Sequence, residues 1–197
     1  MTALLEAKDI AYAYGSNAVL RSVGFSACAG EFIALLGLNG AGKSTLLDIL
    51  AGLRRAQSGA VRIEDRELAL WGARERARWI GHLPQGIRGE LPFTVEQIVL
   101  MGRYAYADEW FESDEDRSHA VRAMERMDCL PYRERAYHTL SGGERQRVLL
   151  AACLAQEPKI LLFDEPSTYL DVHQQLQCFS TLAAVAESGA LCIAVTH

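Results

Sequence analysis

Gly37-Leu-Asn-Gly-Ala-Gly-Lys-Ser44 is the stretch that decides the fold of this chain. It fits the phosphate-loop pattern G-x-x-x-x-G-K-[S/T], in which glycines let successive backbone N–H groups turn inward around an anion. In that pattern Lys43 reaches the β- and γ-phosphates of a nucleotide, and the Ser44 hydroxyl is a ligand for Mg²⁺. The loop residues predicted to bind a nucleotide are Gly37, Asn39, Gly40, Ala41, Gly42, Lys43, Ser44 and Thr45.

The sequence on either side of the loop supplies the context that this motif needs. Residues 32–36, Phe-Ile-Ala-Leu-Leu, predict a buried parallel strand, and residues 44–50 predict a helix whose N-terminus faces the phosphates. The alternative interpretation is a glycine-rich turn that holds a lysine by coincidence. The strand before the loop and the helix after it argue against that alternative.

The composition describes a globular chain without a strongly basic character. The chain has 197 residues, of which 50% are apolar, and this suits one α/β domain with a sizeable core. Its 20 lysines and arginines against 25 aspartates and glutamates give a net charge of −5. Nucleic acid is therefore not the favoured partner, because no overall basic field is available to hold a polyanion.

Cysteine usage and hydropathy give two further expectations. The 5 cysteines are an odd number without C-x-x-C spacing and lie mostly in apolar runs, which predicts buried thiols in a reducing cytosol. The longest apolar run, residues 148–155, is far shorter than the roughly 18 residues that a membrane helix needs. If the function involves a membrane, another chain must cross it.

Strand and helix patterns alternate around the phosphate loop. Residues 4–14 and 18–28 predict an antiparallel hairpin, and residues 59–64 predict a further strand of that small sheet. Three more buried strands are predicted at residues 79–83, 160–163 and 190–195, and two helices at 73–78 and 172–187. This alternation predicts an α/β fold, a P-loop NTPase with a mainly parallel core sheet and a small antiparallel β subdomain.

Between residues 91 and 156 the pattern is helical. Helices are predicted over residues 94–104 with Thr94 as N-cap, from the capping-box pattern Ser113-x-x-Asp116, and over residues 144–156. We therefore expect a single domain with an inserted helical subdomain. Its nucleotide-binding core and β subdomain comprise residues 1–90 and 157–197, and the helical subdomain comprises residues 91–156.

Asp164 and Glu165 directly follow the buried strand at residues 160–163. Two acids at the carboxyl end of a buried strand are costly unless they serve a cation or a proton transfer. In phosphoryl transfer one carboxylate holds Mg²⁺ and a neighbouring one polarises the attacking water. The alternative is a helix N-cap or a surface pair, but the phosphate loop in the same chain favours the catalytic interpretation.

A third motif, Leu140-Ser-Gly-Gly-Glu144, combines a hydroxyl, two glycines and a helix start. Such a start is a second ready anion site, made from a side-chain O–H and backbone N–H groups. Ser-Gly-Gly is also a common turn, so the motif alone is a weak signal. A chain with two phosphate-seeking sites nevertheless needs an explanation.

These motifs together resemble the ATP-binding-cassette ATPases, whose signature is very similar to Leu140–Glu144, and the resemblance follows the family's order along the whole chain. It implies that ATP and Mg²⁺ are bound and that ATP is hydrolysed. It also implies a homodimer in which two copies face head to tail. Each ATP would then lie between the phosphate loop of one copy and Ser141, Gly142 and Gly143 of the other.

The resemblance also implies roles for single residues. Tyr14 matches the aromatic that stacks on adenine, with Tyr12 or plain strand packing as the alternatives. Ser44, Gln85 and Asp164 match the metal-binding residues, and Gln85 also matches a glutamine that reaches the attacking water.

Further matches concern catalysis and the dimer. Glu165 resembles the general base, and Asp171 matches a loop that touches the opposite subunit. His197 matches the histidine that contacts the γ-phosphate, so the catalytic residues expected from the resemblance are Lys43, Gln85, Glu165 and His197.

The sequence departs from the family pattern at two places. Tyr169 stands where the family usually has a small residue, and this predicts an altered dimer seam without loss of catalysis. Family members usually continue after the switch histidine with a helix and further strands. We therefore expect a chain that is truncated after His197 relative to the family.

Two short stretches suggest which members are most similar. Residues 94–104 and 168–175 are similar to ATPase subunits of bacterial importers for iron-siderophores, haem and cobalamin. The resemblance then implies a membrane permease as partner, a substrate-binding protein as indirect partner, and a peripheral location on the cytoplasmic face of the membrane.

Three alternatives stay open: an ATPase for another transported substrate, a soluble ATP-switched module that acts on a macromolecule, and a metabolite kinase. The short stretch between Lys43 and Ser141 leaves no room for the long coiled-coil insertion of chromosome-maintenance members. A kinase would leave Ser141 and His197 without roles.

A groove lined by residues 86–106 is where the resemblance places a short helix of the permease. Interfaces favour aromatic residues and arginine. The candidates for this contact are Arg88, Phe93, Arg103, Tyr104 and Tyr106, with packing of the helical subdomain as the alternative.

Overall fold

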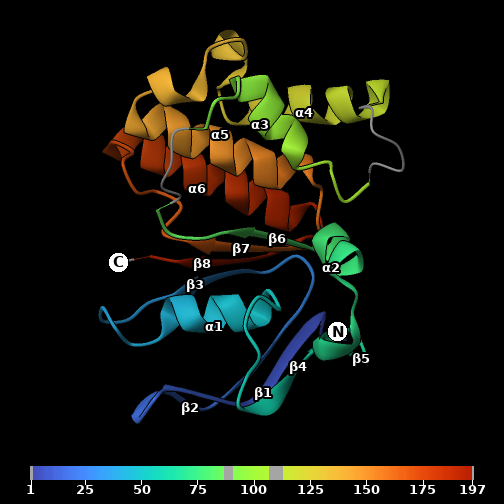
Figure 1. The fold of residues 1–197 in the computed structure, drawn as a ribbon, viewed down its shortest axis with the longest axis vertical. Helices are drawn as coiled ribbons and strands as arrows, with labels where there is room; N and C mark the ends of the chain where they lie inside the picture. Colours follow the sequence, from blue (N-terminus) through green and yellow to red (C-terminus); the bar gives the residue numbers. More distant parts are fainter. Residues whose placement is uncertain (1, 87–90, 107–112, 197) are drawn as a thin grey trace.

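The computed structural model describes residues 2–86, 91–106 and 113–196. Two β-sheets lie on either side of the helix α1 (Lys43–Leu50), which follows the phosphate loop, and a group of helices covers the outer face of the parallel sheet (Figure 1). This arrangement confirms the predicted α/β fold with a parallel core sheet, a small antiparallel sheet and a helical part.

The antiparallel sheet has the strand order β2-β1-β4-β5. The predicted hairpin is present as β1 (Leu5–Tyr14) and β2 (Asn17–Ala27), and β4 (Ser58–Ile63) pairs with the other edge of β1. The short strand β5 (Arg66–Glu67) and the 3-10 helix η1 (Leu68–Leu70) lead out of this sheet.

The core sheet has the strand order β3-β8-β7-β6, and all of its strand pairs are parallel. Its strands are β3 (Phe32–Leu35), β6 (Ile80–Leu83), β7 (Ile160–Asp164) and β8 (Leu191–Val195). Every residue of β7 and β8 is buried, as expected for central parallel strands covered on both faces. The short helix α2 (Ala73–Trp79) runs directly into β6, so Trp79 ends a helix instead of starting the predicted strand.

The helical part contains α3 (Val95–Met101), α4 (Asp114–Arg126) and α5 (Gly142–Ala155), with the 3-10 helices η2 (Leu130–Tyr132) and η3 (Tyr137–Thr139) between α4 and α5. The helix α6 (Val172–Glu187) lies between α5 and the parallel sheet in the view of Figure 1. Both predicted N-caps are confirmed, because Thr94 and Ser113 form complete capping boxes with Gln97 and Asp116.

Two helix boundaries differ from the prediction. The helix α3 ends at Met101 instead of residue 104, and α5 begins at Gly142 instead of Glu144. The second difference has a local cause, because Ser141 caps the helix and lets both glycines adopt helical geometry. The two glycines therefore form the first turn of α5 and do not interrupt it.

The apolar side chains form two clusters, one on each face of the parallel sheet. One cluster joins the sheet to α3, α4, α5 and α6, and the other joins it to α1 and the antiparallel sheet. Cys129, Cys153, Cys178 and Cys192 are buried and free, as the sequence predicts, whereas Cys28 is half-buried. Burial raises the pKa of the Cys153 thiol to about 12, so this thiol stays protonated and unreactive at neutral pH.

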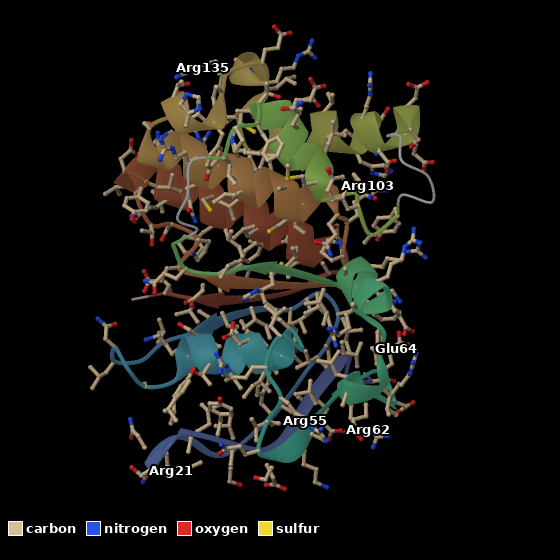
Figure 2. The ribbon with its side chains drawn as sticks, in the orientation of Figure 1. Arg21, Arg55, Arg62, Glu64, Arg103 and Arg135 are labelled. Carbon is tan, nitrogen blue, oxygen red and sulfur yellow. The ribbon has the colours of Figure 1, made fainter. Side chains whose placement is uncertain are left out.

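Arg103 is the main polar link within the helical part. Its Nε lies 2.9 Å from Oδ1 of Asp116, and its Nη1 donates to the carbonyl oxygen of Ala155 over 3.0 Å. Figure 2 labels this side chain where α3, α4 and α5 meet. Because only 8% of Arg103 is exposed, it cannot present a docking surface, and the packing alternative holds for this residue. Arg88, another docking candidate, lies outside the described residues.

The Asp116→Ala variant should lower the free energy of unfolding by roughly 3 kcal/mol or more, because it leaves the buried Arg103 charge unpaired. Urea unfolding followed by circular dichroism measures this loss. The Glu115→Ala variant is a matched control, because the Glu115 side chain is 83% exposed. A loss below about 1 kcal/mol for Asp116→Ala would contradict the structural role of this ion pair.

The same pair predicts how stability depends on pH. Burial tends to raise the pKa of Asp116, but hydrogen bonds from Ser113 and Arg103 outweigh burial and hold the pKa below its usual value. A lowered folded-state pKa stabilises the fold above the carboxyl's unfolded pKa of about 4, and this stabilisation is lost as the pH falls through the folded-state value. The difference in unfolding free energy between wild type and the alanine variant should therefore shrink below about pH 4.

Candidate functional site

The predicted site residues meet because the parallel strands end at one edge of the sheet. Leu35 and Asp164 both pair with Val195, so the last residues of β3, β7 and β8 are level with one another. The phosphate loop follows β3, Glu165 follows β7 and Gln85 follows β6. One edge of the sheet therefore gathers a basic loop, two acids and an amide.

A cleft of about 360 Å³ lies at this edge and is lined by residues from the hairpin, the phosphate loop and three strand ends. Nine of the residues predicted from the sequence line it: Tyr14, Asn39, Gly40, Gly42, Lys43, Ser44, Gln85, Asp164 and Glu165. Val19 and Val195 complete the lining.

Lys43 is held by the loop that it belongs to. Its Nζ donates to the carbonyl oxygen of Gly37 over 2.6 Å and to that of Leu38 over 3.0 Å. The ammonium group is therefore held against the loop, and Lys43 lines the cleft together with Gly40 and Gly42. A fixed cation among backbone donors is suited to a polyphosphate.

Gly42 is required for a steric reason as well as for its backbone conformation. Its φ of 91° lies in the left-handed region, and a Cβ at this position would meet Cγ1 of Val19 at 2.7 Å and Cδ2 of Leu20 at 2.9 Å. Gly40 also has a left-handed φ, 79°, but a Cβ there would meet nothing within 4 Å. The loop thus packs against β2 at Gly42 and faces open space at Gly40.

The oxygen-bearing side chains in the cleft fit a magnesium ion. Asp164 is only 5% exposed at the end of β7, and the Ser44 hydroxyl and the Gln85 amide line the same cleft. Carboxylate, hydroxyl and amide oxygens are the hard ligands that Mg²⁺ prefers, and it takes few protein ligands beside phosphate oxygens and water. These three residues could therefore hold the ion beside a bound phosphate group.

His82 lies on the strand next to Asp164. Burial lowers the pKa of His82 below its usual value, and the carboxylates of Asp48 and Asp164 only partly oppose this effect. At neutral pH the imidazole is therefore uncharged and adds no positive charge beneath the cleft.

Glu165 has an oriented carboxylate and an unusual backbone. Its φ is 54°, its N–H donates to the carbonyl oxygen of Val195 over 3.1 Å, and its Oε2 accepts from the Thr168 hydroxyl over 3.2 Å. Left-handed conformations are uncommon for residues other than glycine and are concentrated at functional sites. This arrangement holds the carboxylate at the edge of the cleft, where it could accept a proton.

Tyr14 stands at the mouth of the cleft. Tyr14 is 48% exposed, and its hydroxyl lies 3.4 Å from Oγ1 of Thr45. Thr45 is the first buried residue of α1. An exposed aromatic ring beside a phosphate loop can stack on a nucleobase. Gly37, Ala41 and Thr45, which the sequence also predicted to bind the nucleotide, do not line the cleft, although Thr45 contacts Tyr14.

Ser141, Gly142 and Gly143 do not line this cleft. Ser141 Oγ accepts from the backbone N–H of Glu144, and Ser141 N–H donates to Oε2 of Glu144 over 2.8 Å. Hydrogen bonds from the Ser141 backbone N–H and side chain to the Glu144 carboxyl hold the pKa of that carboxyl below its usual value. The N–H groups of the two glycines open the helix and have no intrahelical partner, which suits a second anion site.

The loop 165–171 connects the two motifs. Gln146 of α5 donates to the carbonyl oxygen of Pro166 over 2.9 Å, and Tyr169, with a φ of 68°, packs on the side where Gly142 and Gly143 lack a Cβ. Asp171 is exposed and caps α6. His197 lies outside the described residues, so its predicted contact stays a prediction.

Sequence reasoning missed several residues that support the site. Val19 lines the cleft, Thr168 orients Glu165, and Arg54 contacts both tyrosines at the end of β1. Thr168 follows Glu165 by three positions, the spacing of a local turn, so a signal for it was present in the sequence. Arg54 left no such signal, because the loop that carries it has no sequence pattern of its own.

Comparisons with known proteins show the family to which the chain belongs. Residues 20–168 match the profile of the ABC transporter family. The chain is 39% identical over 196 residues to the hemin import ATP-binding protein of Thermobifida fusca, covering 100% of this chain and 69% of that protein. It is 36% identical over 185 residues to a siderophore transport system ATP-binding protein of Bacillus subtilis, covering 93% and 67%.

One further relative and two solved structures are also similar to the chain. An ABC transporter ATP-binding protein of Bacillus subtilis, without an assigned substrate, is 35% identical over 196 residues, and the chain spans only 44% of its length. Among solved structures, a metal-chelate type ABC transporter in an inward-facing conformation has a TM-score of 0.84 at 30% identity, covering 100% of this chain and 74% of that one. A bacterial ABC transporter cassette solved as a dimer has a TM-score of 0.88 at 26% identity, covering 98% and 88%.

Within the described ranges, no helix combines the length and the apolar character that crossing a bilayer requires.

The Gly42→Ala variant should be less stable than the Gly40→Ala variant. Both substitutions force a left-handed backbone on alanine, at a cost of roughly 1–2 kcal/mol, but only the first adds a clash with Val19 and Leu20. Thermal unfolding of the two variants measures the difference. Equal melting temperatures would contradict the close packing of the loop on β2.

The Lys43→Ala variant should bind Mg·ATP between about 10- and 150-fold more weakly, because the phosphates lose a charge-assisted hydrogen bond. Isothermal titration calorimetry measures the affinity. The Lys159→Ala variant is a control, since Lys159 pairs with Glu64 on the surface. Unchanged affinity in the Lys43 variant would contradict nucleotide binding at this loop.

Proposed function

Because the chain belongs to the ABC transporter family, we propose that it is the ATP-hydrolysing subunit that energises import of an iron chelate, haem or cobalamin through a separate membrane permease. The observation that carries this proposal is the single cleft that gathers Lys43, Gln85, Asp164 and Glu165 at one edge of the parallel sheet. Two further parts, a head-to-tail dimer and a docking face, complete the proposal.

Hydrolysis needs a water molecule to attack the γ-phosphate of ATP. In the proposed reaction Glu165 accepts a proton from this water, while Lys43 offsets the negative charge of the phosphates. Magnesium held by Ser44, Gln85 and Asp164 would supply further charge stabilisation at the transferring phosphate. The hydrogen bond from Thr168 fixes one carboxylate oxygen of Glu165, a residue that lines the cleft, and this supports its role as the base.

A second copy would complete the site. Within one chain the phosphate-loop cleft lacks Ser141, Gly142 and Gly143, yet the N-terminus of α5 presents unpaired N–H groups that suit an anion. In a head-to-tail dimer these groups would reach the ATP bound by the partner, and Asp171 would lie at the seam. The likeness to a cassette solved as a dimer supports this part of the proposal.

The proposed docking face for the permease includes fewer residues than the sequence suggests. Tyr104 is 64% exposed and Phe93 is 37% exposed, so both can contact a partner, whereas Arg103 is buried in the helical part. The Tyr106 ring is packed against Arg103, with the guanidinium carbon 4.2 Å from the ring centre. We therefore place the docking contact on Phe93 and Tyr104, and propose that residues 91–156 move as a unit when Gln85 responds to hydrolysis.

The substrate class rests on the names of relatives and on two short stretches. Proteins named for hemin import and for siderophore transport are 36–40% identical to the chain. Through a permease partner, the chain would act at the cytoplasmic face of the membrane as a peripheral subunit.

Two alternatives differ in what the ATPase serves: another transported substrate, or a macromolecule on which a soluble ATP-switched module acts. The net charge of −5 disfavours a nucleic-acid target. Binding of the chain to a permease, or to a soluble macromolecule, discriminates between these alternatives.

The Glu165→Gln variant should bind Mg·ATP with unchanged affinity and hydrolyse it at least about 100-fold more slowly, because it lacks the base. Since ATP then persists, the variant should accumulate as an ATP-dependent dimer. Phosphate release and light scattering coupled to size-exclusion chromatography measure the two effects.

Glu64→Gln is the matched control, because it makes the same charge change at an exposed residue, labelled in Figure 2, that does not line the cleft. If Glu165→Gln turns over ATP at the wild-type rate, Glu165 is not the base. If it remains a monomer with ATP, the head-to-tail arrangement is wrong.

A further inference from the structure

Arg54 contacts the ring of Tyr14, which lines the nucleotide cleft. Its guanidinium carbon is 5.2 Å from the ring centre of Tyr12 and 5.2 Å from that of Tyr14. The two tyrosines are two positions apart on β1, so they point to the same face of the sheet, and their rings meet edge to face with centres 5.1 Å apart. Arg54 does not line the cleft, whereas Tyr14, one of the two rings that it contacts, does.

Polar contacts hold the Arg54 side chain on both sides. Its Nη1 donates to the Tyr12 hydroxyl over 3.0 Å, and its Nη2 lies 3.5 Å from a carboxylate oxygen of Asp48 on α1. The guanidinium therefore bridges the end of β1 and the helix that follows the phosphate loop. The Tyr14 hydroxyl makes a second contact with this helix, at Thr45.

The backbone that carries Arg54 is also anchored at both ends. The carbonyl oxygen of Asp48 accepts from the N–H groups of Leu53, over 2.9 Å, and Arg54, over 3.1 Å. On the other side the Gln57 side chain exchanges two hydrogen bonds with the backbone of Ala13, at 2.9 and 3.1 Å. Arg54 is thus placed before any ligand binds, and little conformational freedom is left to lose.

We propose that Arg54 is a positioning residue for the nucleobase: it holds the Tyr14 ring in the orientation in which the base of bound ATP stacks on it. This inference rests on the proposed function, since it takes ATP as the ligand. In this proposal the phosphates of ATP bind the loop residues and only its base stacks on Tyr14. Loss of Arg54 should therefore weaken binding of ligands that carry a base and spare ligands that do not.

The test compares two probes, ATP and inorganic tripolyphosphate, each titrated calorimetrically with Mg²⁺ into wild type and Arg54→Met. The expected result is an ATP affinity lowered about 3- to 10-fold, on the scale of a cation–π contact, with the tripolyphosphate affinity unchanged. Tripolyphosphate binding also reports whether the variant is folded. Arg54→Lys, which keeps the charge but not the forked geometry, should recover part of the ATP affinity.

Two further variants separate positioning from other effects. Arg55→Met is the matched control: Arg55 is the exposed neighbour labelled in Figure 2 beside the antiparallel sheet, and it should leave both affinities unchanged. In a Tyr14→Ala background, Arg54→Met should have no additional effect on ATP binding, because the ring through which it acts is gone.

Four results would overturn the proposal: unchanged ATP affinity in Arg54→Met, equal loss of affinity for both probes, an Arg54 effect that persists without Tyr14, or unchanged ATP affinity in Tyr14→Ala. None of these results contradicts the proposed ATPase, which fails instead if Lys43→Ala retains full affinity for both probes. The two failures are therefore distinguishable in one series of titrations.

Discussion

Burial of α1 between two sheets is the constraint on which the rest of this structure depends. Leu47 and Leu50 of this eight-residue helix are fully buried, in a cluster that includes side chains of the antiparallel sheet and of the parallel sheet. A short helix is unstable alone, so its position is set by this packing on both sides. As a result, the phosphate loop at its start, Tyr14 on one sheet and Asp164 on the other line one cleft.

The charges in the cleft follow from the same arrangement. Parallel strands bring their carboxyl ends to one edge, and this places the buried Asp164 and Lys43 in the lining of one cleft without a long loop. The uncharged His82 adds no competing positive charge. The site therefore combines a loop suited to an anion with oxygen atoms suited to a metal ion, and this is the combination that phosphoryl transfer to water requires.

The helical part is built on a different principle. Its three helices start with capping boxes at Thr94, Ser113 and Ser141, and the buried pair of Arg103 and Asp116 joins them near the point where α3 ends. A buried ion pair fixes a geometry more than it adds stability. The hydrogen bond from Gln146 to Pro166 and the apolar cluster shared with the parallel sheet connect this part to the core.

The sequence by itself determined the class of fold and most of the cleft. The glycine and lysine spacing of residues 37–44, the acids after a buried strand and the capping boxes are local patterns with local causes, so nine predicted residues line one cleft. The tertiary structure alone decided which side chains are buried or meet across the chain. From the sequence, Arg103 is a candidate interface residue, but in the fold it is buried and paired with Asp116. Arg54 lies near Tyr14 because residues 54–57 fold back onto β1. Long-range contacts of this kind depend on how elements pack, and no pattern of neighbouring residues encodes them.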